Sequence, residues 1–188
     1  MIGQGRHAND AARLFDELLV TLVQAGDRSA AERLAARWQP RLVRTARRLL
    51  ADDELARVAV QECWLAILRG IDTLRDPARF APWAFGILHR KCVDRIRVRQ
   101  AVRSSSGEMT TEPGSGSQTD DGIAIRQAFA LLPPDQRLAA QLFFVEGLTL
   151  AEIAEVQQVP LGTAKTRLFH ARRRLKQVLA ENPQGDVT

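Results

Sequence analysis

Residues 148–176 read LTLAEIAEVQQVPLGTAKTRLFHARRRLK and decide the fold of the C-terminal part of the chain. Thr149 and Glu152 have the spacing of a capping box, which predicts that a helix begins there. We expect that helix to stop near Gln158. Pro160 is favoured in the first turn of a helix, so a second helix should follow at once. Two short helices joined by a tight turn form a helix-turn-helix, whose second helix typically reads duplex DNA in the major groove.

The second predicted helix combines a narrow apolar seam with a basic outer face. Six of the twelve residues from 165 to 176 are Lys or Arg, and none is acidic. A helix that is only solvated usually interleaves Glu with Lys, so the pattern favours DNA contact over that alternative. At about 100° per residue the seam is Ala164, Leu168, Ala171 and Leu175. The residues expected to face DNA are Thr163, Lys165, Thr166, Arg167, Phe169, His170, Arg173 and Lys176.

The whole chain has 188 residues and a formal net charge of +5 at pH 7. This length suits one domain or two small ones. The positive charge favours an anionic partner, either nucleic acid or a membrane surface. No apolar run approaches the ~20 residues of a spanning helix, and the N-terminus lacks the apolar stretch of a signal peptide. We therefore expect a cytoplasmic protein.

Helical periodicity runs through most of the chain, and strand signals are almost absent. We predict an all-α protein of two small helical domains joined by a flexible acidic linker, with the helix-turn-helix in the C-terminal domain. The linker is indicated by residues 104–122, which contain four acids and no Lys or Arg. The predicted first domain, linker and second domain are 10–100, 101–122 and 123–180, after a disordered lead at 1–9. Cys63 and Cys92 are expected to be buried thiols, with a redox switch as the minority alternative.

A helix from Leu55 to about Ile71 has two candidate faces. Its expected buried stripe is Val60, Trp64, Ile67, Leu68 and Ile71. The opposite face mixes apolar residues with a Gln-Glu pair, which solubility alone does not require. A second core contact and a docking surface for a protein partner both fit this pattern. The outward residues are Val58, Gln61, Glu62, Leu65 and Arg69.

The segment from Arg79 to Arg97 interleaves aromatic and basic residues. Aromatic faces stack on unpaired bases while cations follow phosphates, so the mixture suits single-stranded or locally opened nucleic acid. Most of its large apolar side chains (Trp83, Phe85, Ile87, Val93) are better explained as core, whereas Phe80 is left open between core and stacking. The candidate contacts are Arg79, Phe80, His89, Arg90, Lys91, Arg95 and Arg97.

Taken together, these motifs resemble the extracytoplasmic-function (ECF) sigma factors of bacterial RNA polymerase over roughly residues 24–100 and 123–180. The residues that carry the resemblance include Gly26-Asp27, Gln61-Glu62, Trp64, Phe80, Trp83, Ile87 and Asp94 in the first part. In the second part they include Leu132-Pro133, Arg137, Glu146-Gly147-Leu148, Glu152-Ile153-Ala154, Val159-Pro160, Gly162-Thr163, Lys165 and Ala171-Arg172.

The resemblance implies a transcription initiation factor that is not an enzyme and needs no cofactor or metal. It implies that the Gln61-Glu62 face docks on core RNA polymerase and that the 79–97 segment meets the minus-ten element of promoter DNA. The 160–176 helix would read the minus-thirty-five element. An anti-sigma factor is a further partner common in the family. The alternative is an autonomous helix-turn-helix transcriptional regulator, which explains the basic helix but not the other two surfaces.

Three residues depart from the family pattern. Val58 stands where an acidic residue is usual, which removes a charge from the expected polymerase-binding face. Arg90 replaces a frequent Asn, so minus-ten specificity does not carry over. Gln158 replaces the usual Gly of the helix-turn-helix turn, so it has to adopt a positive φ or shift the turn, at a cost of about 1 kcal/mol.

Overall fold

The computed structural model describes residues 4–106 and 128–181, and every regular element in those two ranges is helical. The all-α prediction is therefore confirmed. The longer helices of the first part are α1 (Gln4–Gln24), α2 (Arg28–Leu50), α3 (Asp53–Gly70) and α4 (Phe80–Ser106). The second part contains α6 (Pro134–Ala140), α7 (Leu150–Gln157) and α8 (Leu161–Glu181). Short turns of 3-10 helix (Ile71–Thr73 and Pro77–Arg79) and π-helix (Gln141–Val145) complete the set.

Helix boundaries in the first part follow local chemistry. The Asp27 side chain accepts hydrogen bonds from the backbone N–H groups of Ser29 and Ala30 and so caps α2. Helix α2 then continues through Pro40 to Leu50. Asp52 caps α3 by accepting from the N–H of Leu55. The expected disorder at 1–9 was wrong for residues 4–9, because α1 begins at Gln4.

The helix-turn-helix forms as its sequence predicts. The N–H of Thr149 donates to the Glu152 carboxylate at 2.7 Å, and the N–H of Glu152 donates back to the Thr149 hydroxyl at 3.3 Å. Gln158 ends α7 in the left-handed region with φ at 54°, so of the two alternatives the positive φ is the one adopted. Pro160 lies just before α8, and its carbonyl accepts from Thr163 and Ala164. The start of α8 therefore follows Pro160 rather than containing it.

Trp38 is the centre of the first part's core. It is fully buried, and the ring of Phe80 meets it edge-on with 4.9 Å between centroids. The ring of Phe85 lies 5.5 Å away on the next turn of α4. Aromatic pairs at these separations add about 0.5–1.5 kcal/mol beyond their area burial. Helices α2 and α4 are thereby held together around one aromatic cluster.

Helix α3 is rotated relative to its predicted orientation. Cys63 lies at the centre of its buried face, beside Ala56, Ala59, Val60 and Ile67. Trp64 is only half-buried and Leu68 is 57% exposed, so placing Leu68 in the buried stripe was wrong. The physical reason is that α3 packs against both α2 and α4, so its core face points between them.

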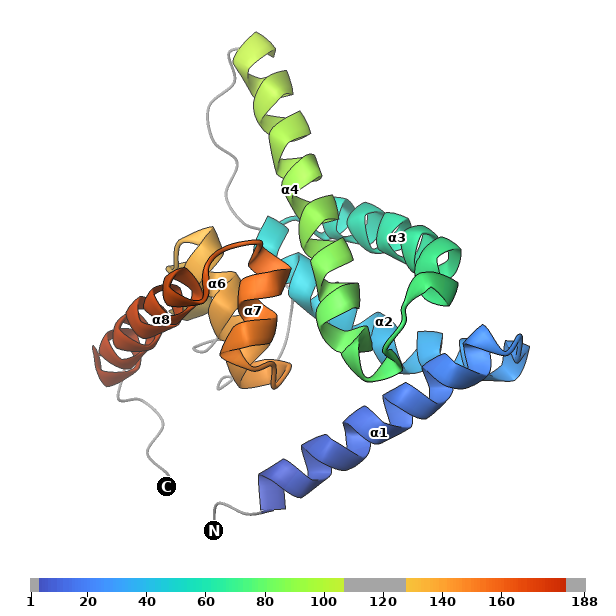
Figure 1. Cartoon of the computed structure of the whole chain (residues 1–188). Coiled ribbons are helices and arrows are strands. Elements are labelled where there is room, and N and C mark those ends of the chain that lie inside the picture. The colour runs from blue at the N-terminus through green and yellow to red at the C-terminus, as the bar shows by residue number, and fades with distance from the viewer. Residues whose placement is uncertain (1–3, 107–127, 182–188) are drawn as a thin grey trace, which may run out of the picture.

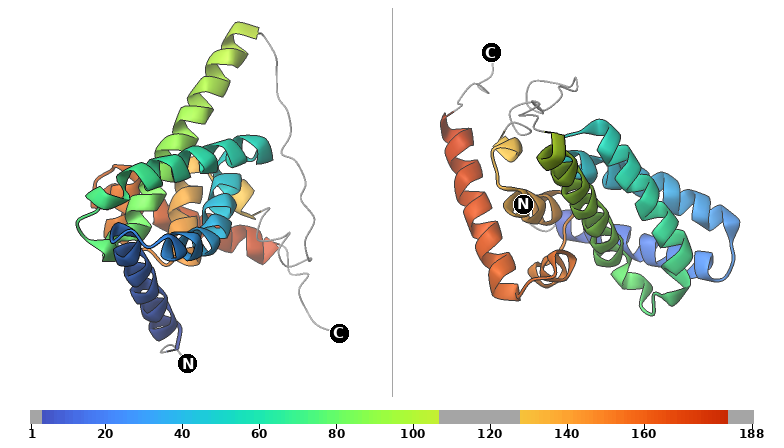
Figure 2. Two further views of the ribbon diagram at one scale, coloured as in Figure 1. Left: turned by 90° about the vertical axis from the view of Figure 1, so that its right-hand side faces the viewer. Right: turned by 90° about the horizontal axis from the view of Figure 1, so that it is seen from above.

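The two halves of the chain pack on each other. Helix α4 contacts α7, and α2 contacts α6. Buried residues of α6 and α7, such as Leu138 and Ile153, belong to the same hydrophobic cluster as Trp38. The C-terminal part of α4 and the N-terminal part of α1 project away from this body (Figures 1 and 2). Helix α4 reaches Ser106, so residues 101–106 of the expected linker are helical. Residues 107–122 lie outside the described part, as do residues 123–127 at the start of the predicted second domain. Residues 128–130 are helical.

Candidate functional surfaces

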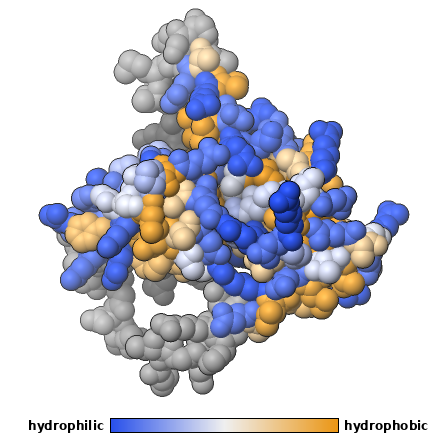
Figure 3. Space-filling view, viewed as in Figure 1, coloured by the Kyte–Doolittle hydropathy of each residue, from blue (hydrophilic) through white to orange (hydrophobic). Residues whose placement is uncertain are grey.

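The outer face of α8 is exposed from Thr163 to Lys176, because its apolar seam is turned inward. Ala164, Leu168, Ala171 and Leu175 are buried, as predicted. Hydrophilic residues project from this edge of the molecule (left in Figure 3). The side chains that the sequence placed toward DNA and that lie exposed here are Thr163, Lys165, Thr166, Phe169, His170, Arg173 and Lys176. The exposed cations form a surface that attracts phosphates.

Arg167 differs from the other members of the predicted DNA-facing set. Its guanidinium donates to the Asp135 carboxylate at 2.6 Å and to the side-chain oxygen of Gln157 at 3.1 Å. These bonds fix α8 against the start of α6 and the end of α7. To contact a base or a phosphate, Arg167 has to share or give up these hydrogen bonds.

The seven candidate contacts of the 79–97 segment do not form one surface. Arg90 and Arg97 are exposed and lie two turns apart on α4, and Lys91 is half-buried. Arg95 is ion-paired with Glu62 of α3. Phe80 is 1% exposed and packs on Trp38. Of the two roles left open for Phe80, the structure supports the core one, because the ring is buried against Trp38.

Two candidate contacts of that segment are engaged by α7. The Arg79 guanidinium is ion-paired with Glu155, and the Nδ1 atom of His89 lies 3.0 Å from the Val156 carbonyl, to which it donates in the matching tautomer. Burial lowers the pKa of His89, and that carbonyl opposes part of the shift. His89 is thus held neutral near pH 7 at the contact between the halves.

The predicted partner-docking residues share the outward side of α3. Gln61 and Arg69 are exposed, Leu65 is 53% exposed, and Val58 is half-buried. Glu62 is half-buried and ion-paired with Arg95, a link between α3 and α4 that the sequence did not predict. Leu68 extends the apolar part of this side by almost one turn. Its spacing of three from Leu65 was the signal that could have revealed it.

A buried carboxylate joins the two halves. Glu146 is 4% exposed and receives Arg41 and Arg44 of α2, each at 2.9 Å. Asp16 of α1 pairs with Arg37 at 2.5 Å and with Arg41 at 3.4 Å, which extends the cluster. Beside it, Arg13 of α1 donates to Glu152 at 3.0 Å and to the Gly147 carbonyl at 3.2 Å. Sequence reasoning missed this cluster, since its partners are far apart along the chain.

Both cysteines are buried, as expected, and burial raises the pKa of each thiol to about 12. They therefore stay protonated and unreactive near neutral pH. Among residues 4–106 and 128–181, no group of His, Cys, Asp and Glu has the arrangement of a metal site. Within the same residues, no helix has the length and apolar character needed to cross a membrane.

Each half of the chain matches a known protein family. Residues 34–102 match the family model of sigma-70 region 2, and residues 123–175 match that of sigma-70 region 4. The ECF RNA polymerase sigma factor SigM of Mycobacterium tuberculosis (strain H37Rv) is 33% identical over 176 residues, which cover 93% of this chain and 87% of SigM. The chain belongs to the ECF RNA polymerase sigma factors. It is thus a transcription initiation factor that directs RNA polymerase to promoters.

Other relatives agree with this membership. The ECF RNA polymerase sigma-E factor of Escherichia coli K12 is 27% identical over 177 residues, covering 85% of this chain and 92% of that factor. The fold of this ECF sigma factor is similar to that of RpoE from Bartonella quintana, solved with the anti-sigma factor NepR. The TM-score is 0.73 at 23% identity, and the match covers 79% of this chain and 96% of RpoE. CnrH, solved with the cytosolic domain of CnrY, gives a TM-score of 0.65 at 23% identity over 89% of this chain and 98% of CnrH.

Membership rests on both halves and not on the helix-turn-helix alone. An autonomous regulator would need only the C-terminal match. The region 2 match over 34–102 covers the α3 and α4 segments that this alternative left unexplained. The sigma factor interpretation is therefore confirmed over the autonomous regulator.

Proposed function

We propose that this sigma factor contacts promoter DNA through two surfaces and core RNA polymerase through a third. A first domain, residues 10–100, docks on polymerase and opens the minus-ten element. A second domain, residues 123–180, reads the minus-thirty-five element, and residues 101–122 connect the two. Polymerase supplies the chemistry of RNA synthesis, so the chain is no enzyme and uses no cofactor or metal. It works where polymerase does, in the cytoplasm.

The exposed basic face of α8 is the observation that carries the proposal for the minus-thirty-five element. The alanines of the buried seam let α8 pack closely on its domain and turn the opposite face outward. A helix presented in this way fits the B-DNA major groove, where cations hold phosphates and other side chains reach base edges. The proposed contacts are Thr163, Lys165, Thr166, Phe169, His170, Arg173 and Lys176, with Arg167 joining if its bond to Asp135 is exchanged.

The basic residues of α4 are the proposed contacts to the minus-ten element. Unstacking a base costs a few kcal/mol, so the opened strand has to be held through its phosphates and by an apolar surface. Arg90, Lys91 and Arg97 are available in the structure as it stands. Arg79, His89 and Arg95 join them once their present partners are released. Phe80 is left out because it is buried.

The outward side of α3 is the proposed docking surface for core polymerase, made by Val58, Gln61, Glu62, Leu65 and Arg69. Exposed leucine beside exposed polar residues is the composition of a protein interface with a small apolar centre. Val58 contributes shape here and not the charge usual at this position. The half-buried Glu62 offers its carboxylate at the edge of the surface, next to Arg95.

The packed arrangement of the two halves implies an opening step in the proposed function. Helix α7 occupies Arg79 and His89, so these residues reach DNA only after α7 moves away from α4. In the holoenzyme on a promoter, the first half binds polymerase and the second half binds the minus-thirty-five element, and these contacts favour the open form. An anti-sigma factor is a further proposed partner, by analogy with the RpoE–NepR and CnrH–CnrY complexes.

Arg173→Ala will weaken promoter binding across promoter sequences and flatten its salt dependence. The slope of log K against log salt should become shallower by about one unit for each phosphate that the variant no longer binds. The measurement is fluorescence anisotropy of labelled promoter DNA with the reconstituted holoenzyme over a salt series. Arg33→Ala is the control, since it removes the same charge from an exposed α2 side chain that belongs to none of the proposed DNA-binding and polymerase-docking surfaces. An identical slope for Arg173→Ala and the wild type would show that Arg173 does not face DNA phosphates.

A further inference from the structure

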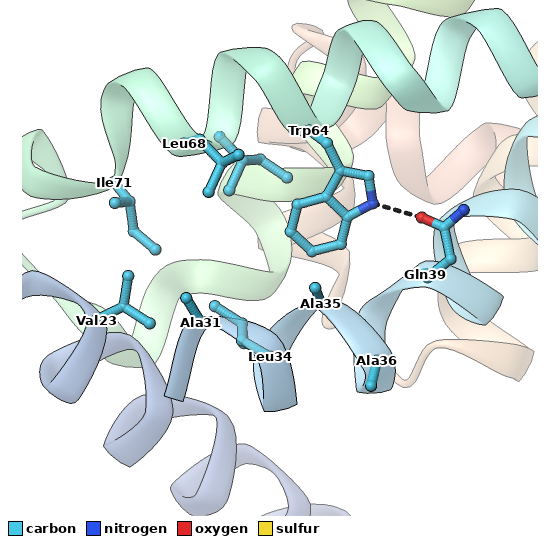
Figure 4. Close-up of a pocket in the computed structure, with 10 residues that line it drawn as sticks. Val23, Ala31, Leu34, Ala35, Ala36, Gln39, Trp64, Leu68 and Ile71 are labelled. Atoms are coloured by element: carbon cyan, nitrogen blue, oxygen red, sulfur yellow. Dashed lines mark hydrogen bonds between the residues drawn. The ribbon is translucent and has the colours of Figure 1, made fainter. Parts of the chain in front are cut away.

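An apolar groove of about 410 Å³ lies between α2 and α3 (Figure 4). Alanines of α2 form one side of it, and the indole of Trp64 with the side chains of Leu68 and Ile71 forms the other. Val23, near the end of α1, completes the lining at one end. The groove exists because Ala31, Ala35 and Ala36 place only methyl groups opposite α3.

The polar atoms of the groove satisfy each other. The Nε1 atom of Trp64 donates to the side-chain oxygen of Gln39 at 2.5 Å (Figure 4). This bond holds the indole as an end wall and leaves its apolar edge toward the groove. A pocket for a small polar ligand needs a few polar groups directed at the ligand. This groove offers none beyond the Gln39–Trp64 pair, so it suits an apolar side chain.

The groove is continuous with the proposed polymerase-docking surface. Gln61, Leu65 and Leu68 have the spacing i, i+4 and i+7 on α3 and so share one side of the helix. Leu65 belongs to the docking surface and Leu68 lines the groove, and both are more than half exposed, at 53% and 57%. Two exposed leucines beside an apolar groove form a contiguous patch of the kind that marks protein interfaces.

Helical spacing places charged residues of both signs beside the groove lining: Arg28 and Glu32 each precede an alanine of the lining by three residues on α2. Arg28 and Glu32 form an exposed ion pair at 3.8 Å on the first turns of α2, and Arg69 is exposed on α3. An apolar pocket within a polar rim is the arrangement in which buried anchor side chains contribute most of a protein–protein affinity. Because the groove adjoins the docking surface, the partner that covers the one also reaches the other.

We propose that core RNA polymerase, as it docks on α3, inserts a bulky apolar side chain into the groove between Trp64 and the α2 alanines. This inference rests on the proposed docking function of α3 and adds an anchor site to it. The apolar lining fits a Leu, Ile, Met or Phe side chain of the polymerase that enters beside Leu68. The groove then acts as the apolar centre of the interface, and Gln61, Glu62 and Arg69 form part of its rim.

Filling the groove tests this proposal in the full-length chain. Ala31→Phe and Ala35→Leu place apolar atoms where the polymerase side chain would enter. Each should weaken the affinity for purified core polymerase about tenfold or more, measured by fluorescence titration of a labelled chain. The melting temperature should stay unchanged or rise, because the added side chains bury apolar surface. Ala11→Phe, at an exposed alanine of α1, is the matched control and should leave the affinity unchanged.

A fourth variant tells whether the groove proposal or the underlying docking proposal is wrong. Leu65→Arg places a charge on the docking surface outside the groove and should abolish binding. Unchanged affinity in both filled variants, with Leu65→Arg still inactive, overturns the groove and leaves the docking surface in place. Unchanged affinity in all three variants overturns both. If the filled variants keep their affinity but change the oligomeric state in light scattering, the groove serves a second copy of the chain and the proposal is wrong.

Discussion

Glu146→Lys will separate the two halves of the free chain. The carboxylate of Glu146, with 1% of its side chain exposed, lies between Arg41 and Arg44 at 2.9 Å from each. A lysine there sets three cations together at a buried site. Removing one partner of a buried ion pair costs about 3–5 kcal/mol. We expect the free energy of unfolding by urea to fall by about 3 kcal/mol and the radius of gyration in small-angle X-ray scattering to increase.

Glu155→Ala is the matched control for that variant. It also removes an acid that joins the two halves, but the pair of Glu155 with Arg79 has side chains 53% and 51% exposed. Exposed pairs contribute about 0–1 kcal/mol, so the radius of gyration should stay near that of the wild type. If Glu146→Lys keeps both the wild-type radius and the wild-type unfolding energy, the Glu146 cluster does not hold the halves together.

Separation of the two halves of the chain affects the proposed minus-ten contacts. Separation of the halves releases Arg79 from Glu155 and His89 from the Val156 carbonyl. The linker keeps the separated domains at a high effective concentration relative to each other, so each domain can bind weakly on its own. The choice of promoter then rests on both DNA contacts acting together within the holoenzyme.

Glu62→Lys will block association with core polymerase. The substitution reverses a charge on the proposed docking surface, and misplaced like charges across an interface cost several kcal/mol. We expect the affinity for core polymerase to fall by about 100-fold or more in the same fluorescence titration. The structure adds a local effect, because Glu62 is ion-paired with Arg95 and the new lysine faces that arginine.

The charge swap Glu62→Lys with Arg95→Glu separates these two effects. It restores an ion pair between α3 and α4, so the stability of the single variant should recover by about 1 kcal/mol, as is usual for a pair this exposed. It does not restore the carboxylate on α3, so polymerase binding should stay low. Normal holoenzyme assembly by Glu62→Lys, or recovery of binding in the swap, would contradict the placement of Glu62 at the interface.

Local signals in the sequence predicted the second half well. The capping box of Thr149 and Glu152, the positive φ of Gln158 and the seam of α8 all depend on residues close in the chain. Backbone capping and helical periodicity act over three or four residues, so a single sequence is enough to reveal them. The basic face of α8 followed directly, because the position of its seam determines which side chains point outward.

The first half was harder to predict where tertiary contacts decide the outcome. Helix α3 carries two apolar stripes, and only its position between α2 and α4 selects the one centred on Cys63. Phe80 was left open because a buried ring and a stacking ring look alike in sequence, and the contact with Trp38 decides between them. The pairs of Glu146 with Arg41 and Arg44 join residues about 100 positions apart, so local patterns give no sign of them.

Transcription in vitro with purified components tests the promoter-directing role of the chain as a whole. The chain is mixed with core RNA polymerase, and transcripts are measured from DNA fragments that carry candidate minus-thirty-five and minus-ten elements. We expect a stable holoenzyme and transcripts that start at specific promoters only when both the chain and core polymerase are present. Specific binding of the chain alone to a palindromic operator, without association with core polymerase, would contradict this role.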